Sequence, residues 1–579
     1  MRISDFKPSY LLVLKLIILV SLTACSGSRP QPADTPTSLP FTSEPDLIPT
    51  PTLKVGNSAI TSTAETTPAE PTNTGARNPD ASTPEFSIQI GDSLPSELIQ
   101  YIETVIRDKP VQFGIEEDPG RDDQAVINIK QNGQRPLAEW IYTAASPFAT
   151  TADQVTMEAI REGWQSGVND LGQLILDSET ADVFTTTWGP PSNAVWIVQP
   201  SEISSALWAG RPSWTLMPVH QLTPEIKVLK VDGISPLDKD FERSKWPLVV
   251  SFGASGDIVG QDKLQESWDF PKTNFNPDLL TSVAMSGVTA LGRATAYQME
   301  IQGVTVPGKD IGPYMIAADI SHVSHEVPFA PDCPYPNPVG DPIFCARDKY
   351  MDLLLSIGVD VVELTGNHVN DWGVDNFIYT LDLYREAGLE LFGGGRNLVE
   401  AAEPAQFEHN SNKIAFVGCN VAGPPFAWAT EERAGSRPCD LPAFYDQIRA
   451  LKEDGYLVIA TLQYYEFYQY SATAEQRVDF RLVAEAGAAA VSGSQGHHAQ
   501  GFDFYNGAFI HHGLGNLFFD QMDMLGTRQS FIDIYTIYDG RLLNVELVTS
   551  LIENYCCPRL MTPEERNQLL ETVFQASGW

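Results

Sequence analysis

Basic residues are scarce in this chain of 579 residues, and their scarcity excludes one class of partner. Lysine and arginine number 37 against 74 aspartates and glutamates, which gives a formal net charge of −37 at pH 7. A chain of this charge repels nucleic acid and offers no long-range attraction to other polyanions, so we predict no nucleic-acid binding. An anionic group could still bind at a local pocket that carries a cation or a metal ion.

Two common site motifs are also missing. No Cys-x-x-Cys spacing occurs among the seven cysteines, which disfavours a structural zinc site. Three glycines at 393–395 follow an apolar run, but neither a Lys-Ser/Thr pair nor a Gly-x-Gly-x-x-Gly register accompanies them. We therefore expect a tight turn at these glycines rather than a phosphate cradle.

The beginning of the chain predicts export. Arg2 and Lys7 precede an apolar run around Leu11–Val20 that is too short for a membrane span, so residues 1–25 are typical of a secretory signal. Leu22–Cys25 fits the bacterial lipobox, in which the cysteine becomes lipidated; ordinary cleavage nearby is the alternative. We expect a protein exported to the cell envelope and held at the membrane by a lipid anchor on Cys25.

Residues 26–85 are rich in proline, threonine, serine and alanine and have almost no aromatic side chains. Such a composition buries too little apolar surface to offset the entropy of ordering, so it predicts a disordered stalk. About 490 residues remain, enough for two or three domains. We place a first α/β domain at 86–252 and a second domain at 253–579, with its core at about 276–525.

Six cysteines remain once Cys25 is set aside, an even number that favours disulfides in an exported protein. Cys333 and Cys345 flank one proline-rich loop, and Cys419 and Cys439 flank another. We predict these two pairs as local disulfides.

The most informative stretch is Val359–Gly373, where a buried strand over Val359–Leu364 ends in a polar turn. The turn carries Asn367, His368 and Asp371 at what would be the carboxyl edge of a sheet, where α/β proteins place their sites. The alternative to a functional site is that Asn367 only makes a turn and His368 caps the next helix. A second strand-end segment lies downstream and carries His497, His498 and Asn516.

Together with neighbouring segments these motifs resemble the CapA family, the bacterial poly-γ-glutamate capsule proteins. The resemblance runs through Asp360–Gly373, Gly393–Ala401, Val458–Tyr468 and Gly493–Asp520. It implies an α/β metallophosphatase-like fold, a β-sandwich flanked by helices, with strand-end loops converging on a site.

Two segments of the first domain, 140–164 and 214–237, resemble periplasmic solute-binding proteins of the phosphate-binding kind. Hydroxyl groups at 146–151, just before a helix expected from Ala152, would be an anion seat or, more commonly, a helix cap.

The chain departs from the CapA pattern at several positions where the family has metal-binding groups. Val288 replaces an aspartate, and Gln463, Ser494 and Gln495 replace histidines. A complete two-metal site is therefore disfavoured. The surviving groups predict at most one divalent ion, manganese or zinc, with four ligands: Glu326, Asn367, His368 and His497. His368, Glu466 and Asp371 are the candidate catalytic groups, and His498 and Asn516 the candidate substrate contacts.

Two functions follow from the resemblance. The first is a surface lipoprotein in capsule or poly-γ-glutamate biosynthesis, with a reduced metallophosphatase-like site acting as a hydrolase or transferase. The alternative is a non-catalytic protein that binds or scaffolds the polymer. Either would work with the envelope polymer or the capsule biosynthesis machinery.

Overall fold

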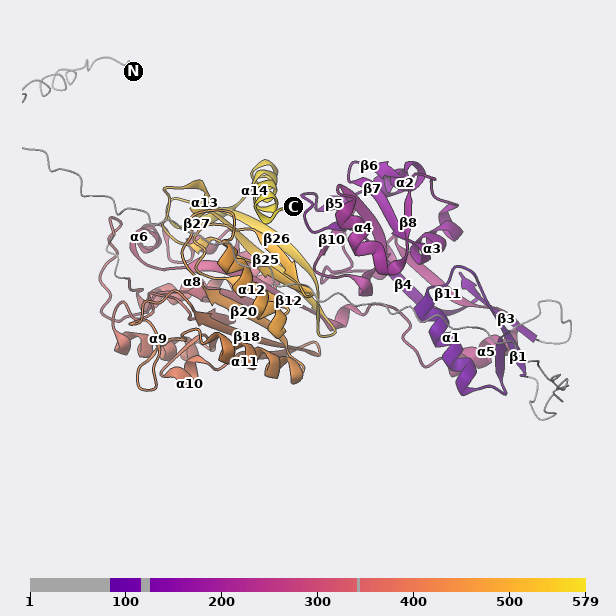
Figure 1. Cartoon of the computed structure of the whole chain (residues 1–579), viewed down its shortest axis with the longest axis horizontal. Helices are drawn as coiled ribbons and strands as arrows, with labels where there is room; N and C mark the ends of the chain where they lie inside the picture. Colours follow the sequence, from indigo (N-terminus) through magenta and orange to yellow (C-terminus); the bar gives the residue numbers. More distant parts are fainter. Residues whose placement is uncertain (1–83, 116–124, 341–343) are drawn as a thin grey trace, which may run out of the picture. The chain divides into compact units, whose positions relative to one another are not determined.

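The computed structural model describes residues 84–115, 125–340 and 344–579 (Figure 1). Cys25, the predicted signal and nearly all of the predicted stalk lie outside these residues. The described residues all fall within one compact unit, so the predicted division near residue 252 stays a prediction. Within the described ranges, no helix has the length and apolar character needed to cross a bilayer.

The first sheet contains eleven strands in the order β2-β1-β3-β11-β4-β9-β7-β6, with β10 and β8 attached to β4 and β7 and with β5 on β10. Short strands alternate with helices, as the sequence predicts. The strands are β1 (Phe86–Ile90), β2 (Phe113–Ile115), β3 (Ala125–Gln131), β4 (Arg135–Pro147), β5 (Gln154–Val155), β6 (Val168–Asn169), β7 (Gly172–Asp177), β8 (Trp196–Val198), β9 (Ser213–Pro218), β10 (Ile226–Val231) and β11 (Val249–Gly256). The helices are α1 (Ser96–Asp108), α2 (Met157–Ser166), α3 (Ser178–Trp188), α4 (Ile203–Ala209) and α5 (Ile258–Ser267).

The second sheet has the order β15-β14-β13-β12-β25-β26-β27, with β24 paired to β12. Its first four strands are parallel, and β25 runs antiparallel to β12. The strands are β12 (Leu280–Thr289), β13 (Ile320–His325), β14 (Val361–Glu363), β15 (Glu390–Phe392), β24 (Asn516–Phe518), β25 (Gln529–Tyr538), β26 (Arg541–Glu553) and β27 (Cys557–Leu560). The helices beside it are α6 (Arg293–Gln302), α7 (Gly312–Ala317), α8 (Met351–Ser356), α9 (Val374–Glu386), α10 (Leu398–Ala401) and α13 (Leu525–Arg528).

The third sheet has the order β17-β18-β20-β21-β23-β22, and its four central strands are parallel. A two-stranded ribbon, β16 (Gly394–Gly395) with β19 (Gly435–Ser436), contains two of the three glycines predicted to turn. The sheet strands are β17 (Ala405–His409), β18 (Asn412–Asn420), β20 (Leu457–Gln463), β21 (Ala490–Gly493), β22 (Phe502–Tyr505) and β23 (Ala508–His511). The helices are α11 (Leu441–Glu453), α12 (Ala474–Ala486) and α14 (Pro563–Ser577).

The second and third sheets share one hydrophobic core. Met285, Val361 and Phe416 belong to this shared cluster, whereas the next residue of β14, Val362, belongs to a separate cluster beneath α8 and α9. On the third sheet, Ile459 faces the shared core and Val458 faces α11 and α12. This period-two alternation builds a helix, sheet, sheet, helix arrangement, and the mixed α/β prediction is confirmed.

One local prediction is wrong. The helix expected from Ala152 begins at Met157, with Thr156 as its N-cap, so the hydroxyl-rich segment does not lead directly into a helix. Phe148, in the middle of that segment, is 2% exposed and packs edge-on against Phe502 and Phe509. Phe148 thus anchors the segment in the hydrophobic core.

Both predicted disulfides are present, Cys333–Cys345 and Cys419–Cys439. A third joins the neighbours Cys556 and Cys557 at the turn between β26 and β27, a pairing that the sequence analysis did not predict.

Candidate active site

The site lies at the carboxyl ends of the parallel strands of the second and third sheets. Glu326 directly follows β13, and the turn with His368 follows β14. Gly366 lets the two meet, because a Cβ atom at this position would lie 2.5 Å from the Cβ of Glu326. The sequence Thr-Gly-Asn-His thus places the imidazole beside the carboxylate.

Val288 occupies the position at this edge where the resemblance implies an aspartate. It pairs with Ser324 of β13 and with Asn516 of β24, and it is 1% exposed. Asp257, in contrast, follows the first-sheet strand β11 and caps α5 by accepting a hydrogen bond from the amide of Gly260. Asp257 therefore does not replace the aspartate that is missing at position 288.

His368 is held by a carboxylate. Its Nδ1 lies 2.7 Å from Oδ2 of Asp371, which also accepts a hydrogen bond from the backbone amide of Phe344 at 3.0 Å. Burial opposes protonation of His368, but the Asp371 hydrogen bond and the charge of Glu326 raise its pKa. Because Nδ1 donates to Asp371, Nε2 is the free nitrogen of the ring. The predicted pair of His368 and Asp371 is therefore brought together.

His497 is held in a similar way, by an amide. Its Nδ1 donates to Oδ1 of Asn516 at 2.7 Å, and the Asn516 amide nitrogen donates to the carbonyl of Thr527 at 2.9 Å. These bonds fix the amide orientation. Nε2 of His497 accepts a long hydrogen bond from the Gln495 amide nitrogen at 3.5 Å and lies 3.8 Å from Glu466 Oε1. Asn516, predicted to contact substrate, thus positions an imidazole.

Glu326 is the electrostatic centre of the group. It is 1% exposed, and neither of its carboxylate oxygens has a hydrogen-bond partner among the described residues. Burial raises the pKa of Glu326, and the nearby His497 and His368 partly offset this effect. A buried carboxyl with no partner favours its neutral form and is free to donate or accept a hydrogen bond from a ligand.

Two of the three positions that have lost histidines, Gln463 and Ser494, belong to a hydrogen-bonded chain. Ser494 Oγ donates to Gln463 Oε1 at 3.2 Å, and Gln463 Nε2 donates to Asn367 Oδ1 at 3.2 Å. Thr365 bonds to Glu363 and lies 3.4 Å from Ser494 Oγ. The chain ends at His322, whose Nε2 is 3.2 Å from Glu363. Asn367 is therefore engaged within the protein.

His498 is not part of the cluster. Its Nδ1 bonds to the carbonyl of Ala499 and its ring contacts Tyr470, and burial lowers its pKa. No contact described here supports the predicted substrate role of His498. Glu466 is more open, 38% exposed at its side chain, and accepts a hydrogen bond from Tyr468.

Sequence reasoning did not include Arg293 in the site. Its guanidinium lies 4.3 Å from the ring centroid of Phe344 and pairs with Asp520. Phe344 contacts His368, and Phe519 contacts His497, so the two rings link the arginine to both imidazoles. Arg293 also has a positive φ of 45°, a strained backbone at the start of α6. In the sequence, the Leu-Gly-Arg segment at 291–293 was the feature that could have pointed to Arg293.

The cluster does not have the spacing of a metal site. In the described ranges, no group of three or more His, Cys, Asp or Glu side chains could hold a metal ion. The Nε2 atoms of His368 and His497 and the unpartnered carboxylate of Glu326 are suitable metal ligands by chemistry, but they are not arranged around a common point. The arrangement is suited to hydrogen bonding and proton transfer with a ligand.

Residues 252–521 match the model of a family described as bacterial capsule synthesis protein PGA_cap. This part of the chain belongs to the CapA family. The capsule biosynthesis protein CapA of Bacillus anthracis is 24% identical over 273 residues, which are 46% of this chain and 66% of that protein. The PGA biosynthesis protein CapA of Bacillus subtilis is 25% identical over 253 residues, 43% of this chain and 66% of that protein. The matches to these two CapA proteins thus span just under two thirds of their length.

Solved structures resemble the fold only distantly. A 5′-nucleotidase from Staphylococcus aureus is 11% identical, with a TM-score of 0.31 over 52% of this chain and 59% of that one. An ABC-type phosphate transport receptor from Vibrio cholerae is 9% identical, with a TM-score of 0.25 over 31% of this chain and 91% of that one.

Proposed function

We propose that this protein is a cell-envelope lipoprotein that acts in capsule or poly-γ-glutamate biosynthesis, anchored through Cys25. The observation that carries this proposal is the CapA-family match of residues 252–521, together with the cluster of Glu326, His368 and His497 at the sheet edge within it. The polymer segment would contact the site through the carboxyl of Glu326 and the Nε2 atoms of His368 and His497.

The chemistry available at this site is proton transfer. Glu326, with its raised pKa, donates a proton or hydrogen bond to a substrate oxygen, and His368, oriented by Asp371, accepts one from the attacking group. Glu466, with a side chain that is 38% exposed and 3.8 Å from His497 Nε2, fits the same acid/base role. The activity would be a hydrolase or transferase reaction on the polymer.

A single manganese or zinc ion remains part of the proposal only as a prediction from the resemblance. Elemental analysis of the purified chain tests it directly. Near-stoichiometric metal that is lost in both His368→Ala and His497→Ala would support the ion. Absence of metal after incubation with manganese or zinc would contradict it.

The second candidate function is polymer binding without catalysis. It is favoured by the chain of hydrogen bonds through Ser494, Gln463 and Asn367, which occupies the side-chain groups that would otherwise face a substrate. In this reading the site recognises an envelope polymer and presents it to the biosynthesis machinery.

The experiment that tests both is deletion of the gene followed by complementation. We expect surface polymer to fall on deletion, to return with the wild-type gene, and to stay low with Glu326→Gln or His368→Ala. Glu408→Gln, an exposed carboxylate on β17, is the matched control and should complement fully. Unchanged polymer on deletion would refute the function. If the variants change the chain length of the polymer but still bind it, the site is catalytic. If the variants no longer bind the polymer, the protein acts as a scaffold.

Localisation has its own test. Cys25→Ser should move the protein from the detergent phase to the soluble fraction of the envelope, because a lipid chain supplies the membrane affinity. Retention in the membrane would contradict anchoring at Cys25.

A further inference from the structure

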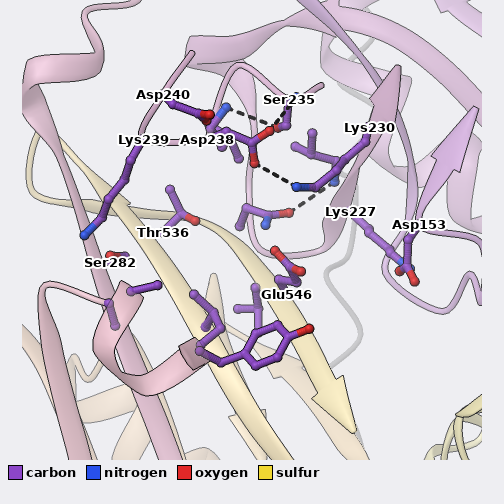
Figure 2. A pocket seen from close by; sticks show the side chains of 18 of the residues that line it. Asp153, Lys227, Lys230, Ser235, Asp238, Lys239, Asp240, Ser282, Thr536 and Glu546 are labelled. Atoms are coloured by element: carbon purple, nitrogen blue, oxygen red, sulfur yellow. Dashed lines mark hydrogen bonds and ion pairs between the residues drawn. The ribbon is translucent and has the colours of Figure 1, made fainter. Parts of the chain in front are cut away.

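A cavity of about 610 Å³ lies well apart in the fold from the cluster around Glu326, between β10, α7, β25 and β26 (Figure 2). Its volume is in the range of pockets that hold small organic ligands. Apolar side chains, including Val228, Ile534 and Val545, line part of it, and charged side chains line the rest. The charged groups decide what it can bind.

The lysines of the cavity are already neutralised by partners within the protein. Lys227 Nζ lies 2.6 Å from Asp153 and donates to the carbonyl of Thr150, and its side chain is only 11% exposed. Lys230 forms an ion pair with Asp238 (Figure 2), in which Nζ lies 2.8 Å from Oδ1. Neither ammonium is therefore available to attract an anion.

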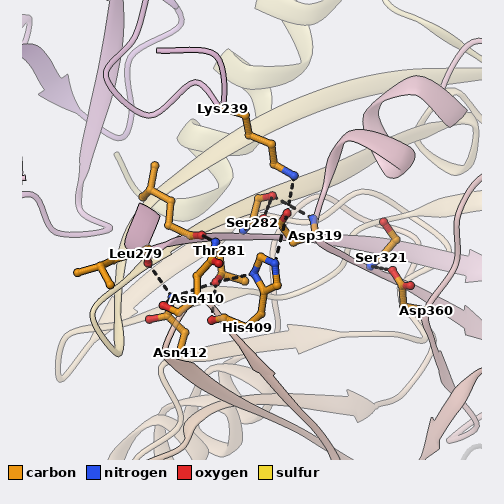
Figure 3. Close-up of polar contacts among 11 residues, drawn as sticks. Lys239, Leu279, Thr281, Ser282, Asp319, Ser321, Asp360, His409, Asn410 and Asn412 are labelled. Carbon is orange, nitrogen blue, oxygen red and sulfur yellow. Dashed lines mark hydrogen bonds and ion pairs between the residues drawn. The ribbon is translucent and has the colours of Figure 1, made fainter. Parts of the chain in front are cut away.

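The third lysine is engaged on the neighbouring wall. Lys239 Nζ lies 2.6 Å from Asp319, whose other oxygen accepts hydrogen bonds from the amide and hydroxyl of Ser282, both at 2.8 Å (Figure 3). His409 approaches the same carboxylate to 4.0 Å. This polar cluster ties the loop after β10 to the start of β12 and fixes one side of the cavity.

Two carboxylates remain without a counterion. Glu546 and Asp240 line the cavity and form no hydrogen bond or ion pair with any described residue. The lining contains three lysines and four carboxylates, but Lys239 pairs with Asp319 outside the lining, so the carboxylates of Glu546 and Asp240 are both left without an ion-pair partner. Burial raises the pKa of Glu546, although Lys230 lies close enough to oppose the shift. The Glu546 side chain is exposed on the cavity side of β26 and has no ion-pair partner, so a bound cation would supply the partner that it lacks.

We propose that this cavity binds an aliphatic amine, with Glu546 as the partner of its ammonium group and the apolar wall as the contact for its alkyl chain. A metal ion is disfavoured because, in the described part of the chain, no three ligating side chains surround a common point. An anion is disfavoured because every lysine of the lining already has a carboxylate. Asp240 would contribute a second, weaker attraction.

The test is a calorimetric titration of the full chain with n-pentylamine, with 1-pentanol and glutarate as the neutral and anionic comparisons. We expect saturable binding of the amine alone. Glu546→Gln keeps the side-chain volume and should weaken binding at least about tenfold, the size of one charge-assisted hydrogen bond. Asp240→Asn should weaken it less.

Glu162→Gln, an exposed glutamate on α2 that does not line the cavity, is the matched control and should bind like the wild type. Rising salt should weaken the amine complex, since a partly open ion pair is screened. Three results would overturn the proposal: no saturable amine binding, equal binding by Glu546→Gln with its fold intact by circular dichroism, or tighter binding of glutarate than of the amine.

Discussion

Two adjacent histidines at the end of β23 provide the sharpest test of the packing. His511 and His512 point to opposite faces of the third sheet, as strand alternation requires, yet both are at most 1% exposed because each face is covered. His511 bonds through Nδ1 to Asp533 at 2.7 Å and through Nε2 to the carbonyl of Gln500 at 3.2 Å. His512 packs on Phe480, and neither of its ring nitrogens has a partner among the described residues.

Replacing His512 with leucine should therefore stabilise the protein. Removing unsatisfied buried polar atoms is worth about 1–3 kcal/mol at neutral pH. Burial lowers the pKa of His512 well below 6.5, and the positive charges of Arg477 and Arg481 add to the effect. The folded state thus keeps the ring neutral while the unfolded state takes up a proton below pH 6.5.

The sign of the pH dependence follows from that difference. The wild type has the full benefit of a neutral His512 above pH 6.5 and loses it as the pH falls, by about 1.4 kcal/mol per pH unit. Leucine has no such loss. The advantage of His512→Leu should therefore grow by about 2 kcal/mol between pH 6.5 and pH 5.

Denaturant unfolding of both proteins at pH 8, 6.5 and 5 measures this advantage. His511→Leu is the matched variant and should behave oppositely, because it leaves the buried carboxylate of Asp533 without its partner, at a cost of about 3 kcal/mol or more. If His512→Leu is less stable than the wild type, or if its advantage is the same at all three values of pH, the burial argument is refuted.

Three further predictions concern other parts of the fold. Replacing Cys419 and Cys439 by serine together should lower the free energy of unfolding by about 2–4 kcal/mol, measured without reductant; an unchanged midpoint would mean that the bridge contributes nothing. Hydrogen bonds from its arginine partner lower the pKa of Glu565 to about 2, so the stability that this group contributes is present above pH 4.5 and lost towards pH 2. Glu565→Gln should flatten the acid limb of the unfolding curve between these values, and a profile parallel to that of the wild type would contradict the assignment. Gln463→Leu leaves two polar partners unsatisfied and should cost about 1–3 kcal/mol, against no change for the exposed Gln406→Leu; equal stability of the two variants would rule out the network.

Local patterns were sufficient to predict much of the fold. The apolar run at Val361 and Val362 gave the strand, and the polar turn after it placed His368 beside Asp371, because both features depend on residues a few positions apart. Cysteines flanking short loops paired as expected for the same reason. The helix start near Ala152 was missed because Gln154 and Val155 pair with the distant strand β10, and the helix begins only after this pairing, with Thr156 as its cap.

The site contacts that escaped prediction are those that join distant segments. Arg293, Phe344 and Phe519 are separated by many residues, and no periodicity in the chain links them. The same holds for the unpaired carboxylate of Glu546, since a pocket's excess charge is known only once each lysine has been matched with its partner.

The substituted positions show why counting residues misjudges a site. From the sequence alone, Gln463 and Ser494 count as donors lost from a metal centre. In the folded protein their side chains bond to each other and to Asn367, so they satisfy polar groups that would otherwise be buried without partners. Other buried polar atoms of the site, both oxygens of Glu326 and Oε1 of Gln495, have no partner among the described residues. The network thus orders the substituted side of the site, while Glu326 keeps its hydrogen-bonding capacity for a ligand.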